Sequence, residues 1–137
     1  MGLEVNVVEI RQRRLHASVV LIGVYRPSQS KSQWFDLFNE LTLHLLTQGK
    51  LVIMGDINAA ICRPTSYPGN NTTSLAGTRP VCTAPTRVTQ TTATCIDIIA
   101  VNEDFAVTQP NVIHRAISYH YLVTASYCQF QYCQGIL

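Results

Sequence analysis

The feature that most constrains the fold is an apolar run at residues 16–25, HASVVLIGVY, which Pro27 ends. Its β-branched residues and its length are typical of a β-strand. Because the run is apolar almost without interruption, we expect its side chains to be buried on both faces of a sheet. The sequence therefore predicts a central strand, which needs neighbours on either side and a layer to cover it.

Further strand patterns flank this run. Residues 3–10, LEVNVVEI, place Leu3, Val5 and Val7 on alternate positions, and the following RQRR is expected to form a polar turn. Residues 50–55, KLVIMG, predict a second buried strand. Residues 59–85 are rich in Pro, Gly, Asn, Ser and Thr and predict a long loop. Strands are expected again at 86–101, as a hairpin, at 111–117 and at 121–132.

One helix is expected, over residues 33–47, with Ser32 as its N-cap and Gly49 closing it. Apolar residues recur there at intervals of three and four, which predicts one buried stripe. The members of that stripe are Trp34, Leu37, Phe38, Leu41, Leu45 and Leu46. At 137 residues the chain fits one domain, residues 1–137. Its many strands and single helix favour an α+β or layered α/β sandwich over a doubly wound sheet.

Composition excludes several classes of protein. With 47% hydrophobic and 13% charged residues, the chain is not expected to be disordered. Five scattered cysteines give neither a zinc motif nor a disulfide framework. The first residues do not resemble a signal peptide, and no apolar run reaches the roughly 18 residues of a membrane span. We therefore expect a reduced, intracellular protein, cytoplasmic or nuclear, with no membrane contact.

The formal net charge of +2 is too small to indicate a strongly basic binding surface. Arg63, Arg79 and Arg87 nevertheless fall in the least regular stretch of the chain. Loop arginines suit contacts with phosphate groups of nucleic acid. The alternative interpretation is that they are solvated loop charges.

Three short segments carry candidate chemistry. In VIMGDIN, Asp56 and Asn58 lie two residues apart at the end of a strand, so they can share a face; a simple turn is the alternative. Asp97 interrupts the apolar segment TCIDII, where a buried charge needs a partner, unless this is an edge strand with Asp97 facing solvent. His120 precedes the last strand, and although a lone histidine is more often structural, Asp97 is the carboxylate that could orient it.

Five ordered segments together resemble the endonuclease/exonuclease/phosphatase superfamily, in the apurinic-type variant of non-LTR retrotransposons. They are YRP at 25–27, MGDIN at 54–58, PTRVT at 85–89, TCIDIIAVN at 94–102 and SYHYLV at 118–123. The resemblance extends from about residue 3 to residue 127. It implies a four-layer α/β/β/α sandwich, of which this chain would form the C-terminal part, and a Mg²⁺-dependent endonuclease that nicks DNA.

The resemblance also implies a role for each matching residue. Tyr25 would contact the scissile phosphate, and Asp56 would hold the metal and activate the attacking water. Asn58 would orient that water, and Asp97 would pair with His120, which contacts the phosphate. Arg63 and Arg87 are the expected nucleic-acid contacts.

Two departures from the family pattern imply an impaired enzyme. The family's upstream strands, which carry its principal metal-binding Glu, would be missing from a chain that begins as this one does. The acidic residue of the family's SDH motif is replaced by Tyr119 in Ser118-Tyr119-His120. Since Mg²⁺ binds through oxygen ligands and commonly through carboxylates, metal affinity should fall severely. The alternative hypothesis is a non-catalytic DNA-binding or interaction module.

Overall fold

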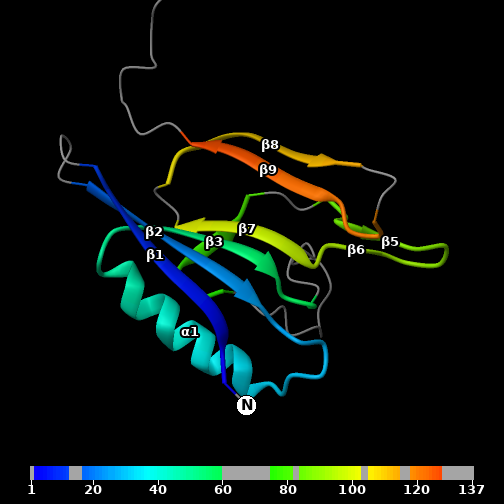
Figure 1. Cartoon of the computed structure of the whole chain (residues 1–137), viewed down its shortest axis with the longest axis horizontal. Coiled ribbons are helices and arrows are strands. Elements are labelled where there is room, and N and C mark those ends of the chain that lie inside the picture. The colour runs from blue at the N-terminus through cyan, green and yellow to red at the C-terminus, as the bar shows by residue number, and fades with distance from the viewer. Residues whose placement is uncertain are drawn as a thin grey trace, which may run out of the picture.

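The described part of this computed structural model is an open sheet with a helix on one face and a hairpin on the other (Figure 1). It comprises residues 2–12, 17–59, 75–81, 84–102, 105–114 and 118–127. Its elements are β1 (Glu4–Gln12), β2 (Ala17–Tyr25), α1 (Gln33–Leu46), β3 (Lys50–Asp56), β4 (Thr78–Pro80), β5 (Arg87–Val88), β6 (Ala93–Thr94), β7 (Asp97–Asn102), β8 (Val107–Ile113) and β9 (Leu122–Tyr127). The strand-rich α+β class expected from the sequence is confirmed.

The main sheet has five strands in the order β1-β2-β3-β7-β4. Strands β2 and β3 are parallel because α1 carries the chain back between them, and the other pairs are antiparallel. Strands β8 and β9 form a separate antiparallel pair on the face opposite α1 (Figure 1). A small hairpin of β5 and β6 extends beyond the end of β7. The described residues thus form helix, sheet and second-sheet layers of the expected sandwich.

Strand β2 lies inside the sheet, between β1 and β3, as its apolar sequence predicted. On the face toward α1, Val20, Ile22 and Val24 are buried in the larger core cluster. On the other face Val19 is buried in a smaller cluster, and Leu21 packs against it while half-buried. Burial is therefore complete only on the helix side, because β8 and β9 cover part of the opposite face.

Helix α1 packs its Trp34, Phe38 and Leu45 side chains against the sheet. Leu37, expected in the same stripe, is 48% exposed, and the buried Thr42 takes a core position instead. Thr42 is tolerated there because its hydroxyl donates to the Phe38 carbonyl at 2.8 Å. The buried stripe is narrower than predicted. Because an α-helix has 3.6 residues per turn, a residue three positions after a buried one, such as Leu37 after Trp34, lies to one side of the buried face.

Helix α1 begins where predicted, after Ser32, and ends one residue earlier than predicted. Ser32 is the N-cap residue, but its side chain makes no capping hydrogen bond. Its backbone is already helical, with φ −55° and ψ −35°, whereas a capping side chain needs a non-helical backbone. The helix ends at Leu46, with Thr47 as the C-cap residue, so the predicted end was one residue too late and Gly49 does not close it.

The segments after β3 need several corrections. The loop expected over 59–85 contains the short strand β4, and its residues 60–74, including Arg63, lie outside the described residues. The hairpin expected over 86–101 is confined to β5 and β6, and β7 is a separate strand of the main sheet. Cys95 lies between β6 and β7 and is disulfide-bonded, so the expectation of reduced cysteines is wrong at this position.

Strand β8 begins four residues before the predicted start at residue 111 and passes through Pro110. Its pairing with β9 shifts register between Thr108 and Asn111. Such an irregularity accommodates a proline, which cannot donate to a regular ladder. Within the last two predicted strands, residues 115–117 and 128–132 lie outside the described part.

The packing of α1 yields a direct test of the core. Phe38→Ala removes a fully buried ring and should lower the free energy of unfolding by about 3–5 kcal/mol. Leu37→Ala, one residue away and half-exposed, is the matched control and should change it by only about 0.5 kcal/mol. Urea unfolding followed by circular dichroism measures both. Equal losses in the two variants would contradict this assignment of the buried face.

Candidate active site

Three neighbouring strands bring candidate residues together at one end of the main sheet. Tyr25 is the last residue of β2 and is paired in register with Asp56, the last residue of β3. Asp56 is in turn paired with Asp97, the first residue of β7, because those strands are antiparallel. Tyr25 is 48% exposed, while both aspartates are half-buried. The strand register alone therefore places these three residues in a row.

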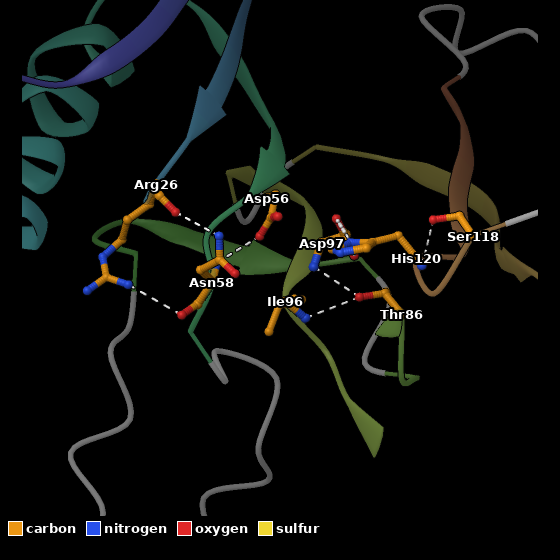
Figure 2. A network of polar contacts seen from close by, with 8 residues as sticks. All are labelled: Arg26, Asp56, Asn58, Thr86, Ile96, Asp97, Ser118 and His120. Atoms are coloured by element: carbon orange, nitrogen blue, oxygen red, sulfur yellow. Dashed lines mark hydrogen bonds and ion pairs between the residues drawn. The ribbon is translucent and has the colours of Figure 1, made fainter. Parts of the chain in front are cut away.

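His120 reaches the same place from the other side of the hairpin β5–β6. His120 lies shortly before β9, and an isolated β-bridge pairs its backbone with that of Arg87 in β5. Its Nδ1 donates to the carboxylate of Asp97, at 2.9 Å from Oδ2 and 3.1 Å from Oδ1 (Figure 2). The His120 N–H also donates to the Ser118 hydroxyl at 3.1 Å. The contact expected between Asp97 and His120 is present, while the role of this pair in chemistry stays a prediction.

Asp56, Asp97 and His120 form a compact cluster of potential metal ligands. One ligand atom from each lies within 4.8 Å of the others, and the described part of the chain holds no other such group. The two carboxylates are the oxygen ligands of this cluster, and Asp97 also accepts the hydrogen bond from His120 Nδ1. Mg²⁺ is commonly held by one or two carboxylates together with substrate phosphates. The donor set therefore fits a hard divalent cation, which would supply positive charge to a bound phosphate.

The electrostatic environment of Asp56 is mixed. Its partial burial raises the pKa of the carboxyl above the ordinary value of 3.8. The Asn58 backbone N–H, which donates to Oδ1 at 2.9 Å, acts in the opposite direction. The charge of Asp97 raises the pKa further, while His120 and Arg87 lower it. Burial decides the net direction, so the ionised carboxylate is held in a place that disfavours its charge.

Asn58 adopts the left-handed backbone conformation, with φ 47°. Its side-chain Nδ2 donates to the Arg26 carbonyl at 2.9 Å (Figure 2). The amide group thus holds the backbone of the chain after β2. The water-orienting role expected for Asn58 stays a prediction.

Thr86 connects the parts of the site, although no role was predicted for it beyond its place in the PTR segment. It is 1% exposed, and its hydroxyl oxygen accepts the N–H groups of Ile96 at 3.1 Å and Asp97 at 2.9 Å. Its carbonyl accepts the N–H of Tyr121 at 2.6 Å. Thr86 therefore holds the start of β7 and the segment around His120 in one arrangement (Figure 2).

The remaining predicted residues lie at the margin. Arg87 is exposed on β5, and its charge lowers the pKa of Asp56, so it stands close enough to act on the cluster. Tyr119 is 72% exposed, and its carbonyl accepts the N–H of Val88 at 3.2 Å. The position where the family pattern has an acid therefore carries a neutral, solvent-facing phenol beside His120.

Comparison with known proteins agrees with this arrangement. Residues 4–120 match the Endonuclease/Exonuclease/phosphatase family. The chain belongs to this family. Members of the endonuclease/exonuclease/phosphatase family generally depend on a divalent metal. The resemblance carried by the five sequence segments is thereby confirmed. No match was found among curated proteins.

Solved structures show the same fold. The endonuclease domain of TRAS1, a telomere-specific non-LTR retrotransposon, matches with a TM-score of 0.68 and 18% identity, covering 93% of this chain and 64% of that one. The Haemophilus ducreyi cytolethal distending toxin matches with a TM-score of 0.53 and 13% identity, covering 93% and 59%. The chain thus spans less than two thirds of either structure.

In the described part no helix is long and apolar enough to cross a membrane.

The position of Asp56 predicts a pH-dependent gain in stability from Asp56→Asn. Because the folded-state pKa is raised, the folded protein binds more protons than the unfolded chain between the two pKa values, and stability declines as pH rises through that window. The asparagine removes this loss. The midpoint of thermal unfolding should rise at pH 7, and the rise should shrink below pH 3.8, the ordinary value. A lower midpoint at pH 7 would contradict the raised pKa.

The contacts of Thr86 predict a specific loss on Thr86→Val. The substitution leaves the N–H groups of Ile96 and Asp97 without their acceptor, at a cost of roughly 1–3 kcal/mol for each buried group. Thr86→Ser keeps the oxygen and is the control. Hydrogen exchange should show both amides losing protection in the valine variant alone. Unchanged protection in a folded Thr86→Val chain would exclude this role.

Proposed function

We propose that this chain carries the phosphodiester-hydrolysing site of a retrotransposon DNA endonuclease, in a form whose cutting is impaired. The observation that carries the proposal is the cluster of Asp56, Asp97 and His120 at the strand ends of a chain of this family. Carboxylates that hold a cation and an imidazole that donates to a phosphate oxygen would supply the electrostatic stabilisation that phosphodiester hydrolysis needs. Support for the retrotransposon branch comes from the five motifs and from the TRAS1 domain as a structural neighbour.

Each residue would have a distinct task. Asp56 would hold the cation and accept a proton from the attacking water, a task suited to a carboxylate whose pKa is raised. His120, held by Asp97 through Nδ1, would present its other nitrogen to the phosphate. Tyr25, exposed at the end of β2, would donate its hydroxyl to the same phosphate. Asn58 would orient the water through the part of its amide that Arg26 leaves free.

The arginines would contribute nucleic-acid contacts outside this centre. Arg87 lies exposed on β5 next to His120, where it can meet a backbone phosphate. Arg63, which lies outside the described residues, is the second proposed contact. DNA is the proposed substrate, and Mg²⁺ is the proposed cation.

Impairment would arise at Tyr119. This residue precedes His120 and offers a phenol in place of a carboxylate, and its side chain is 72% exposed. Of the two carboxylates in the cluster, Asp97 is already engaged by His120. A single fully available carboxylate holds a divalent cation weakly, because affinity grows with the number of charged oxygen ligands. Weak cation binding would leave the phosphate's charge poorly neutralised and the hydrolysis slow.

The proposal predicts a gain of function from Tyr119→Asp. The added carboxylate should raise Mn²⁺ affinity by roughly tenfold, as charged oxygen ligands do, and should increase nicking of supercoiled plasmid. Tyr119→Asn is the matched control, because asparagine has the size of aspartate without its charge. It should change neither the Mn²⁺ affinity nor the nicking. Calorimetric titration with Mn²⁺ and gel analysis of the plasmid measure the two effects.

Three outcomes are informative. Nicking by Tyr119→Asp that disappears when Asp56→Ala is added supports the proposal. Strong nicking by the unaltered chain would show that Tyr119 does not impair it. Metal-independent DNA binding that weakens steeply with salt, with no nicking by any variant, would favour the non-catalytic binding module.

A further inference from the structure

Arg26 is a buried arginine that links the end of β2 to the turn after β3. It follows Tyr25 directly and is 8% exposed. Its Nη2 donates to the Ser30 carbonyl at 2.7 Å. Its Nη1 lies 3.3 Å from the carbonyl oxygen of Ile57 and 3.3 Å from that of Asn58. Figure 2 shows the contact with Asn58. One planar group therefore spans two loops that are distant in sequence.

No carboxylate neutralises this charge within the described part, where the ion pairs are those of Arg11 with Glu9 and of His120 with Asp97. The guanidinium carbon instead lies 4.7 Å from the ring centre of Phe35 and 5.8 Å from that of Trp34. Burying a cation is costly, and an apolar side chain would fill the space without that cost. The contribution that only arginine makes here is its rigid fork of donors.

The fork contacts the turn in which Asn58 has the left-handed backbone conformation, with φ 47°. Asparagine adopts this conformation more readily than most residues other than glycine, so the surrounding contacts select one of several accessible conformations of the turn. The backbone of Arg26 holds the same turn at two further points. Its N–H donates to the Asp56 carbonyl at 2.8 Å, and its carbonyl accepts the Asn58 side chain at 2.9 Å. Arg26 therefore fixes the turn through both its backbone and its side chain.

The turn in this conformation aims the Asn58 N–H at Oδ1 of Asp56, at 2.9 Å. A continuous series of contacts thus runs from the guanidinium, through Asn58, to the carboxylate that faces Asp97 and His120. We propose that Arg26 is a positioning residue, which locks the turn of Ile57 and Asn58 and thereby sets the direction of the Asp56 carboxylate. The consequence of this lock for cation binding rests on the proposed function.

The test compares Arg26→Lys and Arg26→Met in the full chain, with Arg11→Met as the control for loss of an exposed arginine. Lysine keeps the charge and loses the fork, so it should not rescue. Both Arg26 variants should shift the NMR signals of the Asn58 backbone N–H and side-chain amide, and should weaken Mn²⁺ binding by roughly tenfold to a hundredfold, as loss of a group that orients metal ligands does. Arg11→Met should leave both unchanged. Unshifted Asn58 signals in a folded variant, or full rescue by lysine, would overturn the proposal.

A measurement on the unaltered chain guards against variants that fail to fold. A guanidinium fixed by three carbonyls should give separate, slowly exchanging Nη1 and Nη2 signals, whereas one averaged signal would overturn the lock. These NMR signals do not depend on any cation. Absence of Mn²⁺ binding by the Tyr119→Asp chain would therefore count against the proposed function alone, and averaged Nη signals against the role of Arg26 alone.

Discussion

The site depends on two carboxylates placed opposite each other on neighbouring strands. Antiparallel pairing of β3 with β7 sets Asp56 against Asp97, and like charges in such a pair repel. Partial burial of Asp56 adds to the cost of ionising both. The surrounding groups offset this cost, since the Asn58 N–H, His120 and Arg87 all favour the ionised form of Asp56. A divalent cation between the two carboxylates would act in the same direction.

Two buried polar residues hold the halves of this arrangement. Thr86 accepts hydrogen bonds from the N–H groups at the start of β7 and from the chain just before β9. It therefore fixes the positions of Asp97 and His120. Arg26 donates hydrogen bonds to the carbonyls of the turn after β3, and in the proposed role it thereby positions Asp56 and Asn58. Gly55 precedes Asp56 in the second half, and a Cβ at this position would clash with the Val24 carbonyl oxygen. Neither Thr86 nor Arg26 needs to touch a substrate, yet each fixes the direction of groups that would.

The elements that local sequence patterns determine could be predicted, and the positions that tertiary contacts determine could not. The unbroken apolar run of β2 and the spacing of Trp34, Phe38 and Leu45 have physical signatures that a single chain reveals. Thr42 in the core and Pro110 inside β8 do not, since a hydroxyl bond to a preceding turn and a shift of strand register decide them. Asp56 and Asp97 were predicted because an acid at the end of or inside an apolar segment stands out, and His120 because Asp97 could orient it; the structure brings the three together. Arg26 and Thr86 were named only as letters of YRP and PTR, because their partners lie about thirty and ten residues away.

Replacement of an acid by Tyr119 bears on stability as well as on chemistry. A third carboxylate beside Asp56 and Asp97 would increase the repulsion already present, and only a bound cation would relieve it. On the proposed function, a phenol in place of that carboxylate would leave less uncompensated charge in the folded chain and would make its stability depend less on a cation. The hydrogen bonds of Arg26 and Thr86 join protein groups alone, so they stabilise the arrangement of the site without a metal. The substitution proposed to weaken catalysis would thus leave these contacts intact.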